Sequence, residues 1–264
     1  TKNTYVAPFV NAEEAQYLVI ENAFPNGRPA LENAGVMFTS RETVEKVERM
    51  KVCTCLNPLH TALAVYGCLL GYTKISDEMK DADLVKLVEI IGYKEGLPVV
   101  TDPGILSTNK FIDEVLQIRV PNPFMPDTPQ RIACDTSQKL SIRFGETIKE
   151  YMASSELDVK SLKFIPMVQA GWCRYLLGVD DELNAFTVSP DPMYEELAGK
   201  LAGVKVGESC DVHAVLSPIL SDAKIFGVNL YEAGLGEYVE SIFAEQIAGK
   251  GAVRETLKKH LAEA

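Results

Sequence analysis

The chain has 264 residues, of which 47% are hydrophobic and 24% charged, a composition typical of a globular protein and not of a disordered one. Its 26 basic and 37 acidic side chains leave a net charge of −11, which repels phosphate backbones, so no nucleic-acid partner is expected. No run approaches the roughly 20 consecutive apolar residues that cross a bilayer, and the N-terminus lacks a signal-peptide pattern. We therefore expect a cytoplasmic protein without a membrane partner.

The N-terminal 35 residues are broken by proline and glycine, with one candidate strand or short helix over 16–21. We interpret 1–35 as a connecting segment and 36–264 as one helical domain. From Ser40 the pattern becomes helical, because Ser40-x-x-Thr43 opens a charged stretch that leads into an apolar run over 52–72. That run is predicted to be a buried helix.

Further helices are predicted where apolar residues recur at three- and four-residue spacing between proline and glycine breaks. These ranges are 77–92, 108–118, 138–154, 160–178, 191–202, 209–221 and 236–262. Alternating strand patterns are scarce. The predicted fold class is mainly α, with a few short strands near the N-terminus.

Two kinds of site lack their usual sequence signals. The six cysteines are not spaced as metal or redox pairs, and the three histidines lie too far apart for a zinc signature, so no metal site is expected. Four cysteines lie in apolar runs, where free thiols are expected. No G-x-G-x-x-G turn is present, since Gly234-Leu235-Gly236 lacks the third glycine and a preceding strand. The residues that would bind a nucleotide cofactor are therefore unknown.

The first polar cluster lies where the charged stretch meets the apolar run. Proline suits the first helical position and disfavours helical dihedrals before it, so Asn57 is predicted as the N-cap and Pro58 as the first helical residue. His60 then falls in the first turn, where the helix dipole disfavours an imidazolium. The purely structural interpretation is that Asn57 caps the helix, His60 has its hydrogen bonds within the protein, and Lys51 is solvated.

The second cluster runs from Arg131 to Lys139 after a proline-rich approach. Thr136 or Ser137 could cap the helix that follows. The functional interpretation is that Arg131 and Lys139 point into one pocket and bind anionic or hydroxyl-rich groups.

These clusters belong to an ordered set of motifs. The set comprises Phe24-Pro25-Asn26-Gly27-Arg28-Pro29 with Gly35-Val36, Lys51…Asn57-x-x-His60, Arg131…Asp135-x-Ser137-x-Lys139, and Trp172-x-Arg174-Tyr175-Leu176-x-Gly178. From about residue 17 onward the chain resembles the C-terminal, multi-helical domain of the polyol-specific long-chain dehydrogenases. This is the mannitol dehydrogenase family, which includes the hexuronate (fructuronate) reductases.

The resemblance implies a zinc-independent, NAD- or NADP-dependent interconversion of a secondary alcohol and a ketone. It implies that Lys51 is the general acid/base and that Asn57 and His60 hydrogen-bond the reacting oxygen. Glu48 corresponds to a carboxylate near the proton path. It also implies that the dinucleotide is bound mainly by an N-terminal Rossmann domain that is absent from this chain. The isolated chain is therefore expected to be inactive.

The same resemblance implies that Arg131 and Lys139 bind the substrate, a small sugar acid or sugar alcohol. Their charges favour a hexuronate, with mannonate and fructuronate as the reacting pair, over mannitol and fructose. Cys134 stands where polyol-oxidising relatives often carry a histidine, so contacts to the far end of the substrate are expected to differ.

The chain departs from the family at one spacing, because five residues instead of four separate Lys51 from Asn57. At about 100° per residue, one extra position turns Lys51 out of register. We predict that a π-bulge, or a new helix starting at Pro58, absorbs it between Val52 and Asn57.

Two alternatives stay open from the sequence. One is a helical ligand-binding module without catalysis, which the missing nucleotide fingerprint favours. The other is a helical enzyme that uses Cys53 or Cys134 as a nucleophile with His60, although no motif around either cysteine supports it.

Overall fold

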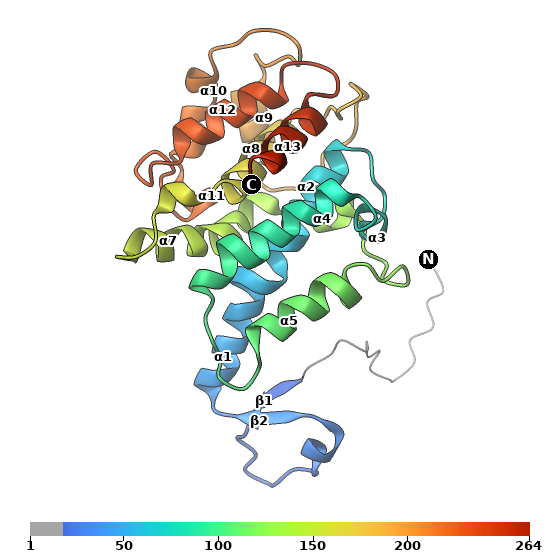
Figure 1. Ribbon diagram of the computed structural model, residues 1–264, viewed down its shortest axis with the longest axis vertical. Helices are drawn as coiled ribbons and strands as arrows, with labels where there is room; N and C mark the ends of the chain where they lie inside the picture. Colours follow the sequence, from blue (N-terminus) through green and yellow to red (C-terminus); the bar gives the residue numbers. More distant parts are fainter. Residues whose placement is uncertain (1–17) are drawn as a thin grey trace.

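A computed structural model describes residues 18–264 and shows a small β lobe attached to a large helical body (Figure 1). Residues 1–17 of the predicted connecting segment lie outside the described residues. The mainly α fold class is confirmed, because the described strands are two short ones and all eight predicted helical ranges contain helix.

The lobe is a parallel two-stranded sheet of β1 (Val19–Glu21) and β2 (Met37–Thr39), in which Val19 pairs with Met37. The 3₁₀ turn η1 (Leu31–Ala34) lies between the strands. Arg28 fills the lobe: its guanidinium lies 3.4 Å from the centre of the Phe38 ring and donates to Asn22. The lobe projects from the body at the start of α1 (Figure 1).

The helical body contains the remaining elements in chain order. They are α1 (Arg41–Met50), η2 (Lys51–Cys55), α2 (Asn57–Leu69), α3 (Ile75–Glu78), α4 (Ala82–Glu89), η3 (Ile90–Gly96), η4 (Leu97–Val99), α5 (Thr108–Glu114), η5 (Val115–Arg119), α6 (Pro129–Ile132), η6 (Thr136–Gln138), η7 (Ser141–Gly145), α7 (Glu146–Ala153), η8 (Val159–Ser161), α8 (Phe164–Tyr175), α9 (Tyr194–Leu201), α10 (Val212–Leu220), α11 (Ala223–Phe226), α12 (Gly236–Gln246) and α13 (Ala252–Ala262).

The predicted helix over 236–262 is two helices, which corrects the sequence interpretation. Gly251 has a positive φ of 78°, a conformation that glycine adopts readily, so the chain turns there. The Asp181 carboxylate then accepts hydrogen bonds from the backbone N–H groups of Val253 and Arg254 and caps α13. That cap comes from a residue about 70 positions earlier, which no local pattern reveals.

Four segments of the helical body are π-helical: η2, η3, η5 and η7. Each one continues a helical path, and η2, η3 and η5 follow directly on α1, α4 and α5. A π-turn lets one extra residue enter a helix without ending it, and such turns occur frequently at functional sites. Three of the four, η2, η5 and η7, carry a basic side chain that recurs in the description of the candidate site below. These side chains are Lys51, Arg119 and Arg143.

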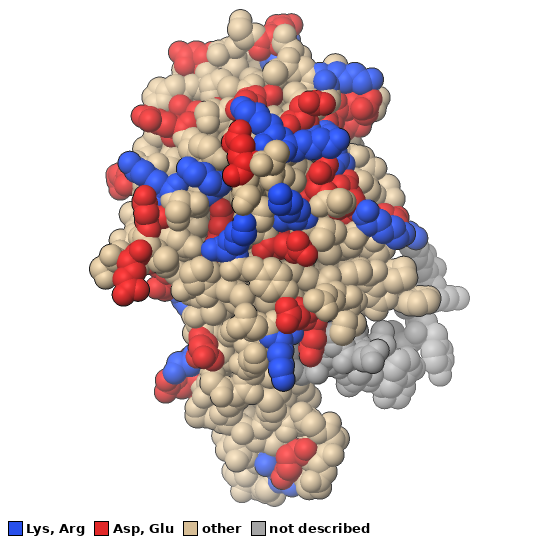
Figure 2. All heavy atoms as spheres, in the orientation of Figure 1, with Lys and Arg blue, Asp and Glu red and all other residues tan. Residues whose placement is uncertain are grey.

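The core is built around α2 and α8. Every residue of α8, and every residue of α2 after Asn57, is buried. The run Arg41–Leu69 is long and apolar enough to cross a membrane by length and composition, but 89% of its apolar window is buried inside the protein. Its apolar side chains are therefore used in the core. On the outside, acidic and basic side chains are intermixed over the face in Figure 2.

One close backbone approach fixes the position of η7. A Cβ atom added at Gly145 would overlap the carbonyl oxygen of Phe226 and lie 3.1 Å from the Cα of Gly227. The end of α11 therefore packs directly on the backbone of η7, which only glycine permits. Gly199 in α9 has no atom within 4 Å of such a Cβ and offers a matched comparison.

We predict opposite effects for alanine at these two glycines. Gly145→Ala should lower the free energy of unfolding by about 1–3 kcal/mol, because the backbone of α11 must move. Gly199→Ala should raise it by about 0.5–1 kcal/mol, the usual gain within a helix. Urea unfolding of both variants measures the difference. Equal effects of the same sign would show that η7 and α11 are not in backbone contact.

Candidate active site

The site begins at Lys51, the first residue of the π-turn η2. The backbone N–H of Leu56 donates to the Lys51 carbonyl at 3.1 Å, five residues back. The path then breaks at Leu56, whose φ is −133°, and α2 starts at Asn57. The structure thus contains both the π-turn and the new helix that the extra residue predicts. Lys51 is half-buried and makes no ion pair within residues 18–264.

The predicted capping role of Asn57 is wrong by one residue. Leu56 is the N-cap, since its carbonyl accepts the first intrahelical bond from the N–H of His60 at 3.0 Å. Pro58 occupies the second helical position, where its missing N–H is equally harmless because no first-turn N–H has an intrahelical acceptor. The half-buried Asn57 amide makes no side-chain hydrogen bond in the described chain. It is available to a ligand.

His60 is buried, with 8% of its surface exposed. Burial has the largest effect on its pKa, and together with the charges of Arg119, Arg143 and Arg131 it lowers that pKa to about 4. The imidazole is therefore neutral at pH 7, as its helix-start position also favours. Its Nε2 atom is buried and has no hydrogen-bond partner within residues 18–264. Because an unpaired buried polar atom costs free energy, a ligand is a natural partner for Nε2.

Sequence reasoning missed Arg143, which enters the site from η7. Its Nη1 donates to Thr61 Oγ1 at 2.7 Å, and Thr61 donates in turn to the Asn57 carbonyl at 2.8 Å. Burial lowers the Arg143 pKa to about 10, which still leaves it charged at neutral pH. The available signal was its spacing of four from Lys139, which places both on one face of a helix.

Lys139 and Arg131 were predicted to point into one pocket, and in the structure each side chain contacts a protein partner. Lys139 is half-buried and donates to the Cys134 carbonyl, and its pKa is lowered by burial and then by Arg143. Arg131 is paired with Asp127, and 59% of its side chain is exposed. Arg131 nevertheless contributes to the positive field at His60. Their substrate contacts stay predictions.

The hydroxyls between them do not cap a following helix, which corrects the sequence interpretation. Asp135 has a positive φ of 53° and starts only the short 3₁₀ turn η6. The Thr136 hydroxyl donates to the Ala133 carbonyl, while the backbone N–H and hydroxyl of Ser137 both donate to Asp191. These bonds fix the loop that carries Lys139.

Glu48 lies on the exposed side of α1, one turn before Lys51. Its role near the proton path stays a prediction. Two interactions connect this part of the chain to α7: Arg49 of α1 pairs with Glu146 at 2.8 Å, and the Thr147 hydroxyl donates to the Cys53 carbonyl of η2 at 3.4 Å.

The structure argues against Cys53 as the nucleophile of the cysteine alternative, whereas Cys134, whose Sγ donates to the Gln130 carbonyl, stays a hypothesis. All six cysteines are free thiols. Burial raises the pKa of Cys55 to about 12 and also raises that of Cys53, so neither is a thiolate at neutral pH. In residues 18–264 no three histidine, cysteine or acidic side chains are grouped as metal ligands.

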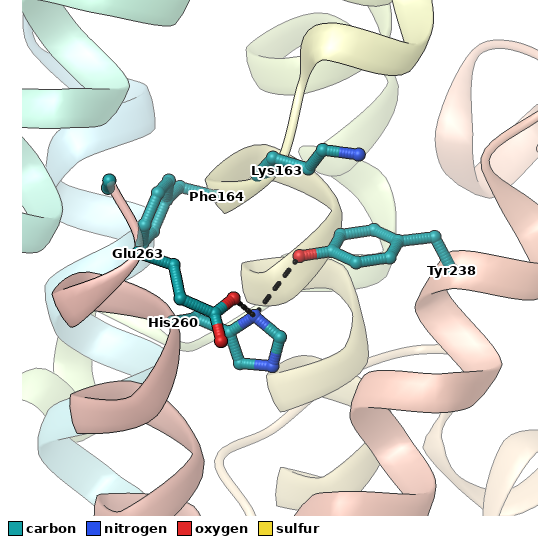
Figure 3. A pocket seen from close by; sticks show the side chains of 6 residues that line it. Lys163, Phe164, Tyr238, His260 and Glu263 are labelled. Atoms are coloured by element: carbon teal, nitrogen blue, oxygen red, sulfur yellow. Dashed lines mark hydrogen bonds and ion pairs between the residues drawn. The ribbon is translucent and has the colours of Figure 1, made fainter.

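A polar pocket between α8, α12 and α13 contains none of the predicted residues (Figure 3). Its polar groups contact one another: the Tyr238 hydroxyl lies 3.5 Å from His260 Nδ1, and His260 Nε2 lies 3.1 Å from Glu245. The Lys163 ammonium lies 4.7 Å from the centre of the Tyr238 ring. His260 thus has polar neighbours at both ring nitrogens, in contrast to His60.

Lys51, Asn57 and His60 thus all lie at the junction of the π-turn η2 and the start of α2, in a body built mainly of helices. The chain matches the family model of the mannitol dehydrogenase C-terminal domain over residues 43–241. It belongs to the mannitol dehydrogenase family.

Individual relatives agree with this assignment. The chain is 60% identical to D-mannonate oxidoreductase of Thermotoga maritima over 98% of its own length and 48% of the relative's. It is 31% identical to D-mannonate oxidoreductase of Escherichia coli, over 71% of the chain and 37% of that protein. The chain thus spans about half or less of the length of these relatives.

Solved structures show the same fold. A ternary complex of Pseudomonas fluorescens mannitol 2-dehydrogenase with NAD and D-mannitol superposes with a TM-score of 0.77 at 27% identity, over 93% of this chain and 46% of that one. A substrate-free D-sorbitol dehydrogenase gives a TM-score of 0.72 at 26% identity, over 89% of this chain and 46% of that one.

We predict that His60 stays neutral through the physiological range. Its folded-state pKa of about 4 lies below the ordinary value of 6.5, so protonation favours the unfolded chain as the pH falls. The free energy of unfolding should therefore decrease from pH 6.5 toward pH 4, and less steeply in His60→Gln. Ring ¹⁵N chemical shifts, assigned with that variant, measure the pKa directly. A His60 titration near pH 6.5 would contradict the buried, cation-surrounded imidazole.

Proposed function

We propose that the full-length protein is an NAD- or NADP-dependent oxidoreductase that interconverts a secondary alcohol and a ketone on a hexuronate. Mannonate and fructuronate are the favoured pair. The observation that carries this proposal is the buried, neutral, unpartnered Nε2 of His60, surrounded by the charges of three arginines. The neutral imidazole can hydrogen-bond the reacting oxygen, and the positive charges favour a substrate that carries a carboxylate. The relatives named as D-mannonate oxidoreductases agree with both.

The described residues do not fit the dinucleotide in the manner of a Rossmann unit. The sheet of residues 18–264 has two three-residue strands, and the segment between them contains a 3₁₀ turn in place of a crossover α-helix. No glycine-rich phosphate turn follows either strand. The residues of this chain are therefore assigned to the substrate side of the reaction.

Proton transfer is assigned to Lys51. When the alcohol is oxidised, its hydroxyl proton passes to the neutral amine of Lys51, and the ammonium returns a proton to oxygen in the reverse direction. Lys51 is half-buried and makes no ion pair within residues 18–264, so no carboxylate of the described chain holds its ammonium group. Glu48, one turn earlier at the surface, would exchange this proton with solvent.

Stabilisation of the negative charge that develops on the reacting oxygen is assigned to Asn57 and His60. The side-chain amide of Asn57 donates one hydrogen bond, and the Nε2–H tautomer of His60 donates a second. A neutral imidazole suits this role, because it donates a hydrogen bond to the alkoxide without giving up its proton, whereas an imidazolium would protonate the alkoxide. The Arg143–Thr61–Asn57 chain of hydrogen bonds fixes the first turn of α2, which carries both donors.

A neutral polyol is the second candidate substrate, since the mannitol 2-dehydrogenase that shares this fold is bound to D-mannitol. For the compartment we propose the cytoplasm, since six free cysteines, four of them buried, suit a reducing environment.

We predict distinct kinetic signatures for the assigned groups. Lys51→Ala should lower kcat by about 10²–10⁴-fold with little change in KM, because it removes a proton-transfer group. Arg131→Ala and Lys139→Ala should chiefly raise KM, because they remove contacts made in the ground and transition states alike. Steady-state assays use the full-length protein with mannonate, fructuronate, mannitol and fructose and both nicotinamide cofactors.

Lys80→Ala is the matched control, because 74% of the Lys80 side chain is exposed and Asp77 is its one ion-pair partner within residues 18–264. A Lys51→Ala protein with near-normal kcat across the pH range would remove the acid/base assignment. Binding of a sugar acid without any turnover of the four compounds would favour the non-catalytic ligand-binding module.

A further inference from the structure

We propose that Arg143 binds the carboxylate of the substrate and thereby selects a sugar acid over a neutral polyol. This inference rests on the proposed function of the same site. It adds a residue that the sequence motifs do not contain and gives that residue a particular part of the substrate.

The first argument is that the half-buried Arg143 lacks a counter-ion, whereas the half-buried Arg254 and the buried Arg174 have their donors occupied. Arg254 pairs with Asp81 and Asp83 at 2.5 and 2.9 Å. The nitrogens of Arg174 donate to three backbone carbonyls, those of Gln246, Val179 and Asp180. Arg143, in contrast, makes one side-chain hydrogen bond, to the neutral hydroxyl of Thr61.

The second argument is electrostatic. No carboxylate within residues 18–264 pairs with Arg143, and burial is the cause that lowers its pKa. Partial removal from water makes a charge without a partner costly, and a bound anion offsets that cost. The chain as a whole carries a charge of −11, so acidic partners for this arginine are plentiful in the sequence. Because no carboxylate of the described chain pairs with Arg143, the guanidinium can pair with an anionic ligand.

The third argument compares Arg143 with the two predicted substrate-binding cations. The Lys139 ammonium donates to the Cys134 carbonyl, and the Arg131 guanidinium is paired with Asp127. Arg143 keeps most of its five N–H donors uncommitted. A guanidinium offers two parallel donors to a carboxylate, an arrangement that a sugar hydroxyl cannot match.

The fourth argument is position. Thr61, to which Arg143 is bonded, follows Asn57 by one helical turn, a rise of about 6 Å. A carboxylate on Arg143 and a reacting oxygen on Asn57 and His60 are therefore separated by a span that a six-carbon chain can bridge. In mannonate, the carbon that becomes the fructuronate ketone is far along the chain from the carboxylate. The two ends of the substrate thus match the two groups of side chains.

The test compares an acid with a polyol in Arg143 variants of the full-length protein. Arg143→Gln should lower kcat/KM for D-mannonate by about 10- to 100-fold, the usual effect of losing hydrogen bonds to a charged group. The value for D-mannitol should change by less than about threefold. Arg143→Lys keeps the charge but loses the paired donors, so its loss should be intermediate and confined to mannonate. Arg41→Gln, an exposed arginine of α1, is the control.

Calorimetric binding of D-mannonate and D-mannitol, measured without cofactor, separates this inference from the proposed function. Loss of mannonate binding in Arg143→Gln supports the inference even if no turnover occurs, a result that would by itself overturn the proposed function. Equal losses for acid and polyol would assign Arg143 to support of α2 and overturn the inference. If Arg143→Gln does not fold, the Arg143→Lys comparison decides in the same way. No mannonate binding by the folded wild-type protein would also overturn the inference.

Discussion

The hydrogen bond from the Leu56 N–H to the Lys51 carbonyl is the constraint on which the site depends. It closes a π-turn that takes up one extra residue, after which the backbone can break and restart as α2. The break frees the Asn57 side chain from capping and places His60 at the buried start of the central helix. The same kind of turn in η7 brings in Arg143. Local departures from α-helical geometry thus build the site out of a helical core.

Around this backbone, the site combines a neutral imidazole with several fixed positive charges. Each arginine makes protonation of His60 less favourable, and burial has the largest effect. The result is a histidine that can donate a hydrogen bond without adding charge, beside cations that attract an acid. A chain with a net charge of −11 maintains such a cluster because helix packing excludes its own carboxylates from Arg143.

Periodicity predicted the helices and the start of the helical pattern at Ser40, and the spacing of Lys51 and Asn57 predicted the π-turn η2. It could not predict η3, η5 or η7, because apolar residues at three- and four-residue spacing fit α- and π-helices alike. The cap at Asn57 was misplaced because proline is tolerated at more than one first-turn position. Arg143 was missed because its importance comes from its contact with Thr61, 82 residues away in the sequence. The spacing of four residues between Lys139 and Arg143 is a local signal, but it does not reveal that long-range contact.

The central claim is that Lys51, Asn57 and His60 meet one oxygen of a substrate whose carboxylate lies on Arg143. A crystal structure of the full-length protein with D-mannonate tests this most directly. The account predicts one substrate hydroxyl within hydrogen-bond distance of Lys51 Nζ, the Asn57 amide and His60 Nε2, with the carboxylate on the Arg143 guanidinium. Mannonate bound elsewhere, or bound with His60 Nε2 still unpartnered and Arg143 contacting only Thr61, would contradict it.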